Sequence, residues 1–179
     1  TTVPATNTIN IASISDDTGV ADDFITKDTT LTFNGTLASA LPADEKVQIS
    51  LDGGTTWKDA TTTGTDWAYD NTGNTMTEGD YTVKARIVDI AGNEGATATQ
   101  VVKIDTTVPA TNTINIASIS DDTGVADDFI TKDTTLTFNG TLASALPADE
   151  KVQISLDGGT TWKDATTTGT DWAYDNTGN

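Results

Sequence analysis

The stretch EGDYTVKARIVDIAGN, residues 78–93, decides the fold class of this chain. Its apolar side chains fall at every second position, at Tyr81, Val83, Ala85 and Ile87, and polar side chains fill most positions between them. This period of two predicts a β-strand with one buried face. Glycine-containing turn signals at 78–80 and 91–93 bound the strand on both sides.

The same pattern extends outward in both directions from this strand. Expected strands cover residues 9–15, 30–34, 46–51, 56–60, 66–70, 81–88 and 96–104. No segment has a helical period. About seven short strands in about 100 residues predict an all-β, Ig-like Greek-key β-sandwich. We expect Phe33, Trp57, Trp67 and Tyr69 to fill most of its core, and the Tyr81 hydroxyl to tie down the preceding turn.

An internal repeat sets the domain organisation. Residues 1–74 recur without one substitution as residues 106–179, an offset of 105. A period of this length is typical of an independently folding domain. We therefore expect one Ig-like repeat at 1–105 and a second, identical repeat at 106–179 that is truncated before its last two strands. We expect those strands to lie beyond the given sequence in a longer tandem array, although an engineered duplication would look the same.

Composition excludes several classes of function. The 179 residues carry a formal charge of −18, which opposes binding to nucleic acid. The absence of His and Cys removes imidazole and thiolate catalysis, their metal sites and disulfides. No apolar run is long enough to span a membrane. We expect no enzymatic activity and no small-molecule substrate, and any bound metal must have oxygen ligands.

The carboxylates cluster in one loop. Residues 16–28 of the first repeat carry five Asp and one Lys: Asp16, Asp17, Asp22, Asp23, Asp28 and Lys27. The second repeat carries the same five at Asp121, Asp122, Asp127, Asp128 and Asp133. Such a loop suits Ca²⁺, which prefers six to eight oxygen ligands. These residues are the predicted Ca²⁺ ligands, with several ions per repeat, and a solvated acidic loop without an ion is the alternative.

A further Ca²⁺ site is expected at the junction between repeats. In a sandwich, the first loop lies at the end where the chain leaves, so it should lie close to Asp105. The loop equivalent to Asp89 and Asn93 in the following repeat should face this end. The linker 104–109 lacks Gly and Ser and contains Pro109, so it should be short and stiff. The expected partners are thus neighbouring identical repeats of the same chain, bridged by Ca²⁺.

The order of several motifs resembles a known family. ISDDTG, VQISLDGGTTW, EGDYTVKARIVDIAGN and VVKID are similar to the bacterial immunoglobulin-like repeats of giant RTX adhesins, in particular the calcium-stabilised extender repeats of ice-binding adhesins from marine bacteria. The resemblance implies secretion, location at the bacterial cell surface, folding on extracellular Ca²⁺, and a spacer role in cell adhesion or biofilm formation.

Other functions fit the sequence less well. Asp17-Thr18-Gly19 matches the aspartic-protease tripeptide, but another Asp precedes it and its copy belongs to a separate repeat. A glycosidase needs two acids across a cleft, which a sandwich of this size does not offer. A ligand-binding module for carbohydrate or a host protein stays open. Exposure of Trp57 or Trp67 on one face would favour it.

Overall fold

The structure, a computed structural model, describes residues 4, 7–109 and 111–178. It divides into two compact units, Thr1–Thr107 and Val108–Asn179. Over the described residues it contains strands, turns and loops, and none of its segments is a helix long and apolar enough to cross a lipid bilayer. The predicted all-β, Ig-like sandwich is confirmed.

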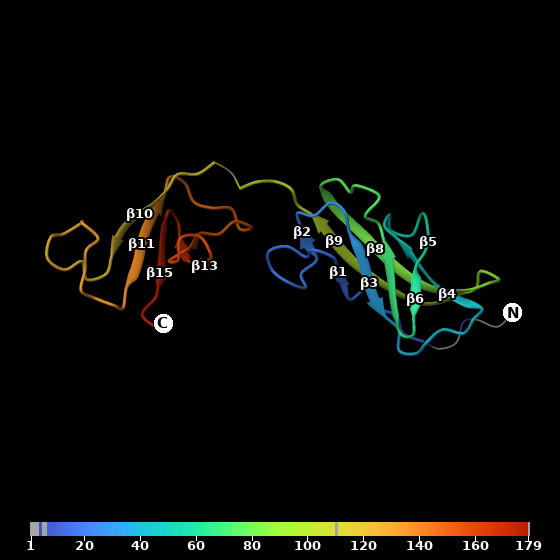
Figure 1. Cartoon of the computed structure of the whole chain (residues 1–179). Coiled ribbons are helices and arrows are strands. Elements are labelled where there is room, and N and C mark those ends of the chain that lie inside the picture. The colour runs from blue at the N-terminus through green and yellow to red at the C-terminus, as the bar shows by residue number, and fades with distance from the viewer. Residues whose placement is uncertain (1–3, 5–6, 110, 179) are drawn as a thin grey trace. The chain divides into compact units, whose positions relative to one another are not determined.

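The first unit is a sandwich of two sheets (Figure 1). One sheet has the order β1-β3-β7-β6, with β1 at Ser13–Ile14, β3 at Thr32–Thr36, β7 at Asp66–Asp70 and β6 at Thr61–Thr63. The other has the order β2-β9-β8-β4-β5, with β2 at Ile25–Thr26, β9 at Glu94–Ile104, β8 at Gly79–Asp89, β4 at Glu45–Ser50 and β5 at Lys58–Asp59. Neighbours are antiparallel except β2 and β9, which are parallel.

The alternation of apolar and polar residues in the sequence correctly predicts which side chains of these strands form the core. Val83, Ala85 and Ile87 of β8 are fully buried, as are Val102 and Ile104 of β9. The described residues of the first unit form nine strands where about seven were expected, because β2 and β6 span only two and three residues and have no readable period. The Tyr81 hydroxyl accepts a hydrogen bond from Thr77 N and donates one to Thr77 O, both at 3.0 Å, as predicted.

The expected core position of Trp57 was wrong. Phe33 and Trp67 are buried and Tyr69 packs against the core, but Trp57 lies half-buried beside β5 on the outer face of its sheet. The Arg86 guanidinium stacks 3.8 Å from the centroid of its ring, and its indole N–H donates to Gly54 O. Arg86 alternates with the buried residues of β8, so its side chain points away from the core. Trp57 packs against this side chain and therefore also lies on the outer face of the sheet.

The second unit repeats the first sheet but not the second. β10 at Ile114–Ile119, β11 at Thr137–Leu142, β15 at Asp171–Asp175 and β14 at Thr166–Thr168 form a four-stranded sheet. Opposite it, the described residues form only the pair of β12 at Gln153–Ile154 and β13 at Lys163–Asp164. A small core of Leu142, Val152, Ile154 and Trp172 remains.

The Trp67 ring packs over Gly35 on the neighbouring strand and holds β7 against β3. Gly35 of β3 is the register partner of Trp67 in β7, and the indole N–H donates to Asn10 O at 3.0 Å. A Cβ atom at Gly35 would collide with both Asn10 O and the Trp67 ring. The second unit builds the same arrangement from Gly140 and Trp172.

We therefore predict that Gly35→Ala lowers the stability of the first unit by about 1–3 kcal/mol, because neither backbone nor buried ring can yield freely. Calorimetric melting is the measurement. Gly73→Ala is the control, since a Cβ there meets nothing within 4 Å and it should leave melting nearly unchanged. Equal melting temperatures for Gly35→Ala and the parent would contradict this packing.

Candidate functional site

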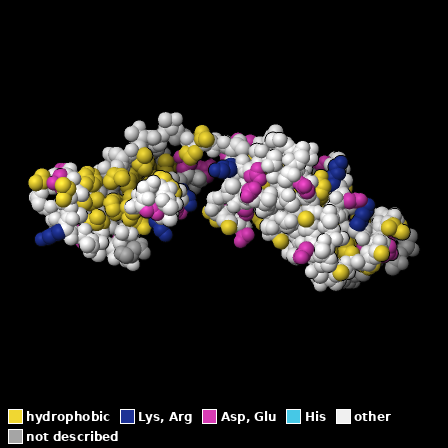
Figure 2. All heavy atoms as spheres, in the orientation of Figure 1, with side chains coloured by type: hydrophobic (Ala, Val, Ile, Leu, Met, Phe, Trp, Pro, Cys, Tyr) yellow, Lys and Arg dark blue, Asp and Glu magenta, His cyan; other side chains and the backbone are white. Residues whose placement is uncertain are grey.

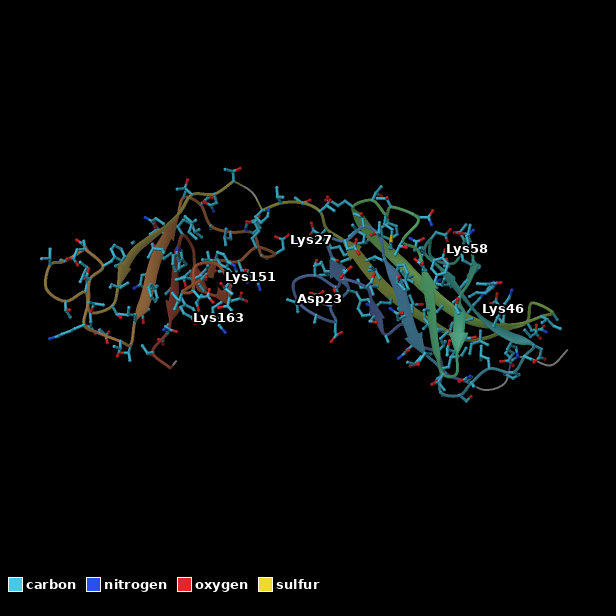
Figure 3. The ribbon with its side chains drawn as sticks, in the orientation of Figure 1. Asp23, Lys27, Lys46, Lys58, Lys151 and Lys163 are labelled. Atoms are coloured by element: carbon cyan, nitrogen blue, oxygen red, sulfur yellow. The ribbon has the colours of Figure 1, made fainter. Side chains whose placement is uncertain are left out.

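The acidic loop 16–28 follows β1 and includes the two residues of β2, and it lies at one end of the first sandwich (Figure 3). Phe24 anchors it, because its side chain is buried in the core while its backbone is left-handed, with φ of 62°. Asp16 and Asp22 are also left-handed, with φ of 49° and 65°. The second unit repeats all three at Asp121, Asp127 and Phe129, so the sequence itself specifies this loop shape.

A buried threonine organises the inside of the loop. The Thr26 hydroxyl donates to Asp16 O at 2.5 Å, and it lies 3.3 Å from the Thr18 hydroxyl. Thr18 Oγ1 accepts from Lys27 N at 2.9 Å. In the second unit the hydroxyl of Thr131 donates to Asp121 O at 2.6 Å. The loop is therefore closed by its own hydrogen bonds.

Asp17 combines partial burial with an unsatisfied oxygen. Its Oδ2 accepts from Phe24 N at 3.3 Å, while Oδ1 is buried and has no hydrogen-bond partner. Asp122 repeats both features, with Phe129 N at 3.3 Å. A buried carboxylate oxygen without a donor is costly, and a hard cation would remove that cost. This oxygen is the feature of the loop that best fits a metal ion.

The remaining predicted ligands of the loop point to different partners. Asp23 Oδ1 accepts from Ile25 N, and Asp28 Oδ1 accepts from Thr30 N and its hydroxyl, all at 2.9–3.0 Å. Asp22 is exposed. In the second unit, Asp128 and Asp133 make the equivalent bonds, Asp127 is exposed, and Asp133 Oδ2 is buried without a partner.

The structure does not gather these carboxylates into one cluster. Within residues 4, 7–109 and 111–178, no three acidic side chains converge as a metal-binding group. Lys27, which could have neutralised the loop, is absent from the ion pairs of this part of the chain, although Figure 3 shows it on the same loop as Asp23. Asp17 and Asp122 are thus single candidate ligands to be completed by other oxygens.

Asp105 lies beside this loop, as the topology predicts. Its N–H donates to Thr26 O at 2.8 Å, directly after the parallel pair of β2 with β9. Its carboxylate accepts from Lys103 Nζ at 2.9 Å and from Thr107 N at 3.1 Å. These bonds, Lys103 foremost, hold the pKa of Asp105 below its usual range. Lys103 therefore competes with any cation for this carboxylate.

Asp89 and Asn93 lie at the opposite end of β9 from Asp105. Asp89 Oδ1 accepts from the N–H groups of Ala91 and Asn93, and Oδ2 accepts from the Asn93 amide at 2.7 Å. These bonds, led by the Asn93 side chain, lower the pKa of Asp89. Within this unit the pair serves as a cap for the β8–β9 turn.

Two further acids have structural roles that sequence reasoning missed. Asp52 accepts bonds from Thr55 N, from Thr56 N and hydroxyl, and from the Ser50 hydroxyl, and it closes the β4–β5 turn. Glu78 accepts bonds from the hydroxyls of Thr106 and Thr107 at 2.8 and 2.6 Å. The Asp-Gly-Gly-Thr-Thr spacing was the available signal for the first, because Asp favours such side-chain turns.

The fold is that of an immunoglobulin-like sandwich, and comparison with family models identifies the kind. The model described as "Bacterial Ig-like domain" matches residues 2–106, more than half of the chain. The chain therefore belongs to the bacterial Ig-like domain family. Comparison with curated proteins finds no match.

The Asp52 turn gives a pH prediction. Hydrogen bonds from Thr56 and Ser50 lower the pKa of Asp52 well below its usual range, so the charged form is favoured in the folded state. A lowered folded pKa contributes stability above the unfolded value, near 3.9, and that stability is lost as the pH falls further. We expect the melting temperature of the first unit to be nearly constant from about pH 7 to 5 and to fall below about pH 4.

Asp52→Asn isolates this contribution. The variant should melt a few degrees lower than the parent at neutral pH, and the difference should shrink as the pH falls below about 4. Circular dichroism melting over a pH series measures it. A difference that is the same at pH 7 and pH 2.5 would exclude the charged turn as its cause.

Proposed function

We propose that this chain is a pair of Ca²⁺-stabilised spacer repeats from an extracellular adhesin of the bacterial cell surface, of the RTX type that includes ice-binding adhesins. The repeats hold a distal binding domain away from the cell, and neighbouring identical repeats are their partners. The observation that carries the proposal is the duplication of 74 residues without a substitution. Identical copies add length without adding a second specificity. We propose no catalytic role.

The placement of the chain ends within the first unit supports a spacer. Pro4 packs against Gly95, at the start of β9, and the chain leaves the unit after Ile104, at the end of the same strand. β9 has 11 residues, which corresponds to about 36 Å. Each complete repeat therefore advances the chain by roughly the length of its longest strand.

Charge supports a role for Ca²⁺. Residues 1–105 contain 6 basic and 16 acidic residues, a net charge of −10. Repulsion among these charges opposes compaction, and bound cations would offset it. Asp17 and Asp122 would be the first ligands, through their unpartnered Oδ1 atoms, with Asp16, Asp22, Asp23 and Asp28 and their copies as further oxygen donors. When bound, Ca²⁺ supplies positive charge and coordination to these oxygens.

A ligand-binding module is the alternative, and the tryptophans of the complete repeat give it little support. Trp67, on β7 of the first sheet, is buried in the core. One face of the Trp57 ring is covered by Arg86, which is itself held by Gln48 and Glu94. A sugar would need to displace this arginine before it could stack on the ring.

We predict that millimolar Ca²⁺ raises the melting temperature of the chain and that EDTA reverses the effect. A site held at 100 times its dissociation constant stabilises the folded state by about 2.7 kcal/mol. The double variant Asp17→Asn, Asp122→Asn should lose most of this shift. Asp66→Asn with Asp171→Asn is the matched control, because it removes the same charge from exposed residues of β7 and β15 and should retain the shift. Equal melting temperatures in Ca²⁺ and in EDTA would refute the proposed binding of Ca²⁺.

The proposed Ca²⁺ ion between neighbouring repeats can be tested by measuring the maximum dimension of a tandem array. Four joined copies of residues 1–105 should give a maximum dimension in small-angle scattering that grows by about 36 Å per copy in Ca²⁺. It should shorten in EDTA while the β-sheet signal persists, because the junction then bends freely. Asp105→Ala should behave in Ca²⁺ as the parent behaves in EDTA. If Ca²⁺ and EDTA give the same dimension with the repeats folded, the bridging ion must be abandoned and the linker alone sets the geometry.

A further inference from the structure

The outer face of the first sheet carries a shallow hollow that recurs in the second unit. Each hollow has a volume of about 380 Å³, and every lining residue of the second is the copy of a lining residue of the first. All four strands of this sheet have counterparts in the second unit, as β10, β11, β15 and β14. The hollow is therefore a property of the repeat itself and does not depend on the β8–β9 hairpin.

The strand register explains why a hollow forms. Ala68 of β7 lies between Asn34 of β3 and Thr61 of β6, and its methyl group is too short to fill the space between them. These positions alternate along their strands with core residues such as Phe33 and Trp67, so the three side chains point away from the core. The hollow thus has a small apolar floor and polar sides.

A second row of polar side chains borders the hollow. Asp66 lies between Thr36 and Thr63 in the register, and all three are exposed. Among the residues that the structure describes, the side chains of Asn34, Thr63 and Asp66 have no hydrogen-bond or ion-pair partner. Asp89, by contrast, accepts three hydrogen bonds from its own turn. The polar groups of the hollow are therefore free to bind a ligand.

Asn34 is an unexpected residue at this position. It belongs to β3, an inner strand of the sheet, and Asn is depleted in strands. Its neighbours across the sheet, Ser13 and Ala68, make no bond to its amide. A residue that contradicts local propensity without a structural partner is typical of a functional position. Asn139 repeats this arrangement between Ser118 and Ala173.

The charge of the sheet selects the class of ligand. Its strands in the first unit contain Asp66 and Asp70 and no Lys or Arg, and Lys and Arg occupy little of the face of this unit that Figure 2 shows. Such a surface repels anionic polymers and other copies of this acidic chain. Of the two acids only Asp66 lines the hollow, whereas a cationic ligand would favour several carboxylates.

We propose that this face of each repeat binds a neutral polysaccharide. The carboxylate of Asp66 accepts hydrogen bonds from two neighbouring sugar hydroxyls, while the Asn34 amide and the Thr61 hydroxyl both donate and accept. A hollow of this volume lies within the range of small-ligand sites. Because each repeat carries one site, sites joined in one chain bind a polymer more tightly than a single site does. The proposal requires neither Ca²⁺ nor the spacer role.

NMR titration of the ¹⁵N-labelled chain with fragments of dextran, mannan and galactan tests the proposal. We expect at least one of these neutral polymers to cause saturable shifts of the amides of β3, β6 and β7 and of their copies, with a dissociation constant of about 1 mM per site. The sulfated form of the same polymer should bind at least tenfold more weakly, because only its charge differs. Absence of saturable shifts with all three polymers, or tighter binding of the sulfated form, would overturn the proposal.

Matched variants distinguish a binding role from a structural one. Asn34→Val should leave the melting temperature equal or higher, because Val favours strands, and should reduce the sites per chain from two to one, because Asn139 still serves the second copy. Thr62→Val is the control, since Thr62 is the register partner of Trp67 and does not line the hollow. It should leave both sites intact.

Two equal sites in the Asn34→Val chain, or loss of a site in the Thr62→Val chain, would show that the hollow is not where the polymer binds. A lysine octapeptide is the competitor that tests the charge argument. It should not displace the polymer, and displacement would mean that the hollow takes a cationic partner instead.

Discussion

The long antiparallel ladder between β8 and β9 is the constraint on which the rest of the complete repeat depends. It joins β2 and β4, which are far apart in the sequence, into one five-stranded sheet. Val83, Ala85, Ile87, Val102 and Ile104 of the ladder are fully buried, so it also closes the core against the sheet that contains Trp67. In the described part of residues 106–179, which does not include this hairpin, the four-stranded sheet forms and only the pair of β12 and β13 lies opposite it.

Much of the fold could be read from the sequence because each long strand has one buried and one solvated face. The period of two in residues 81–87 locates β8, and the composition of 66–70 locates β7. β2 and β6 could not be found, since strands of two or three residues have no measurable period. The position of Trp57 was also hidden, because it depends on Arg86, which lies 29 positions away and belongs to a different strand.

The acidic loop could be located from composition, but its internal arrangement could not. Asp is frequent both in cation sites and in turns, where it accepts bonds from nearby N–H groups. Asp23, Asp28 and Asp89 all cap their own turns, and Asp105 pairs with Lys103. Only Asp17 keeps a buried oxygen without a donor, in both copies. The left-handed Phe24 and Phe129, whose N–H groups donate to Oδ2 of these residues, accompany this arrangement in both copies, and no short motif makes it recognisable from the sequence.

The parallel pairing of β2 with β9 has a mechanical consequence. Because the two strands run in the same direction, tension applied through the chain ends would pull β2 toward its beginning and β9 toward its end. The hydrogen bonds from Lys103 N to Phe24 O and from Asp105 N to Thr26 O would then be loaded side by side in shear, rather than opened one after another. These two hydrogen bonds between β2 and β9 therefore resist such tension together.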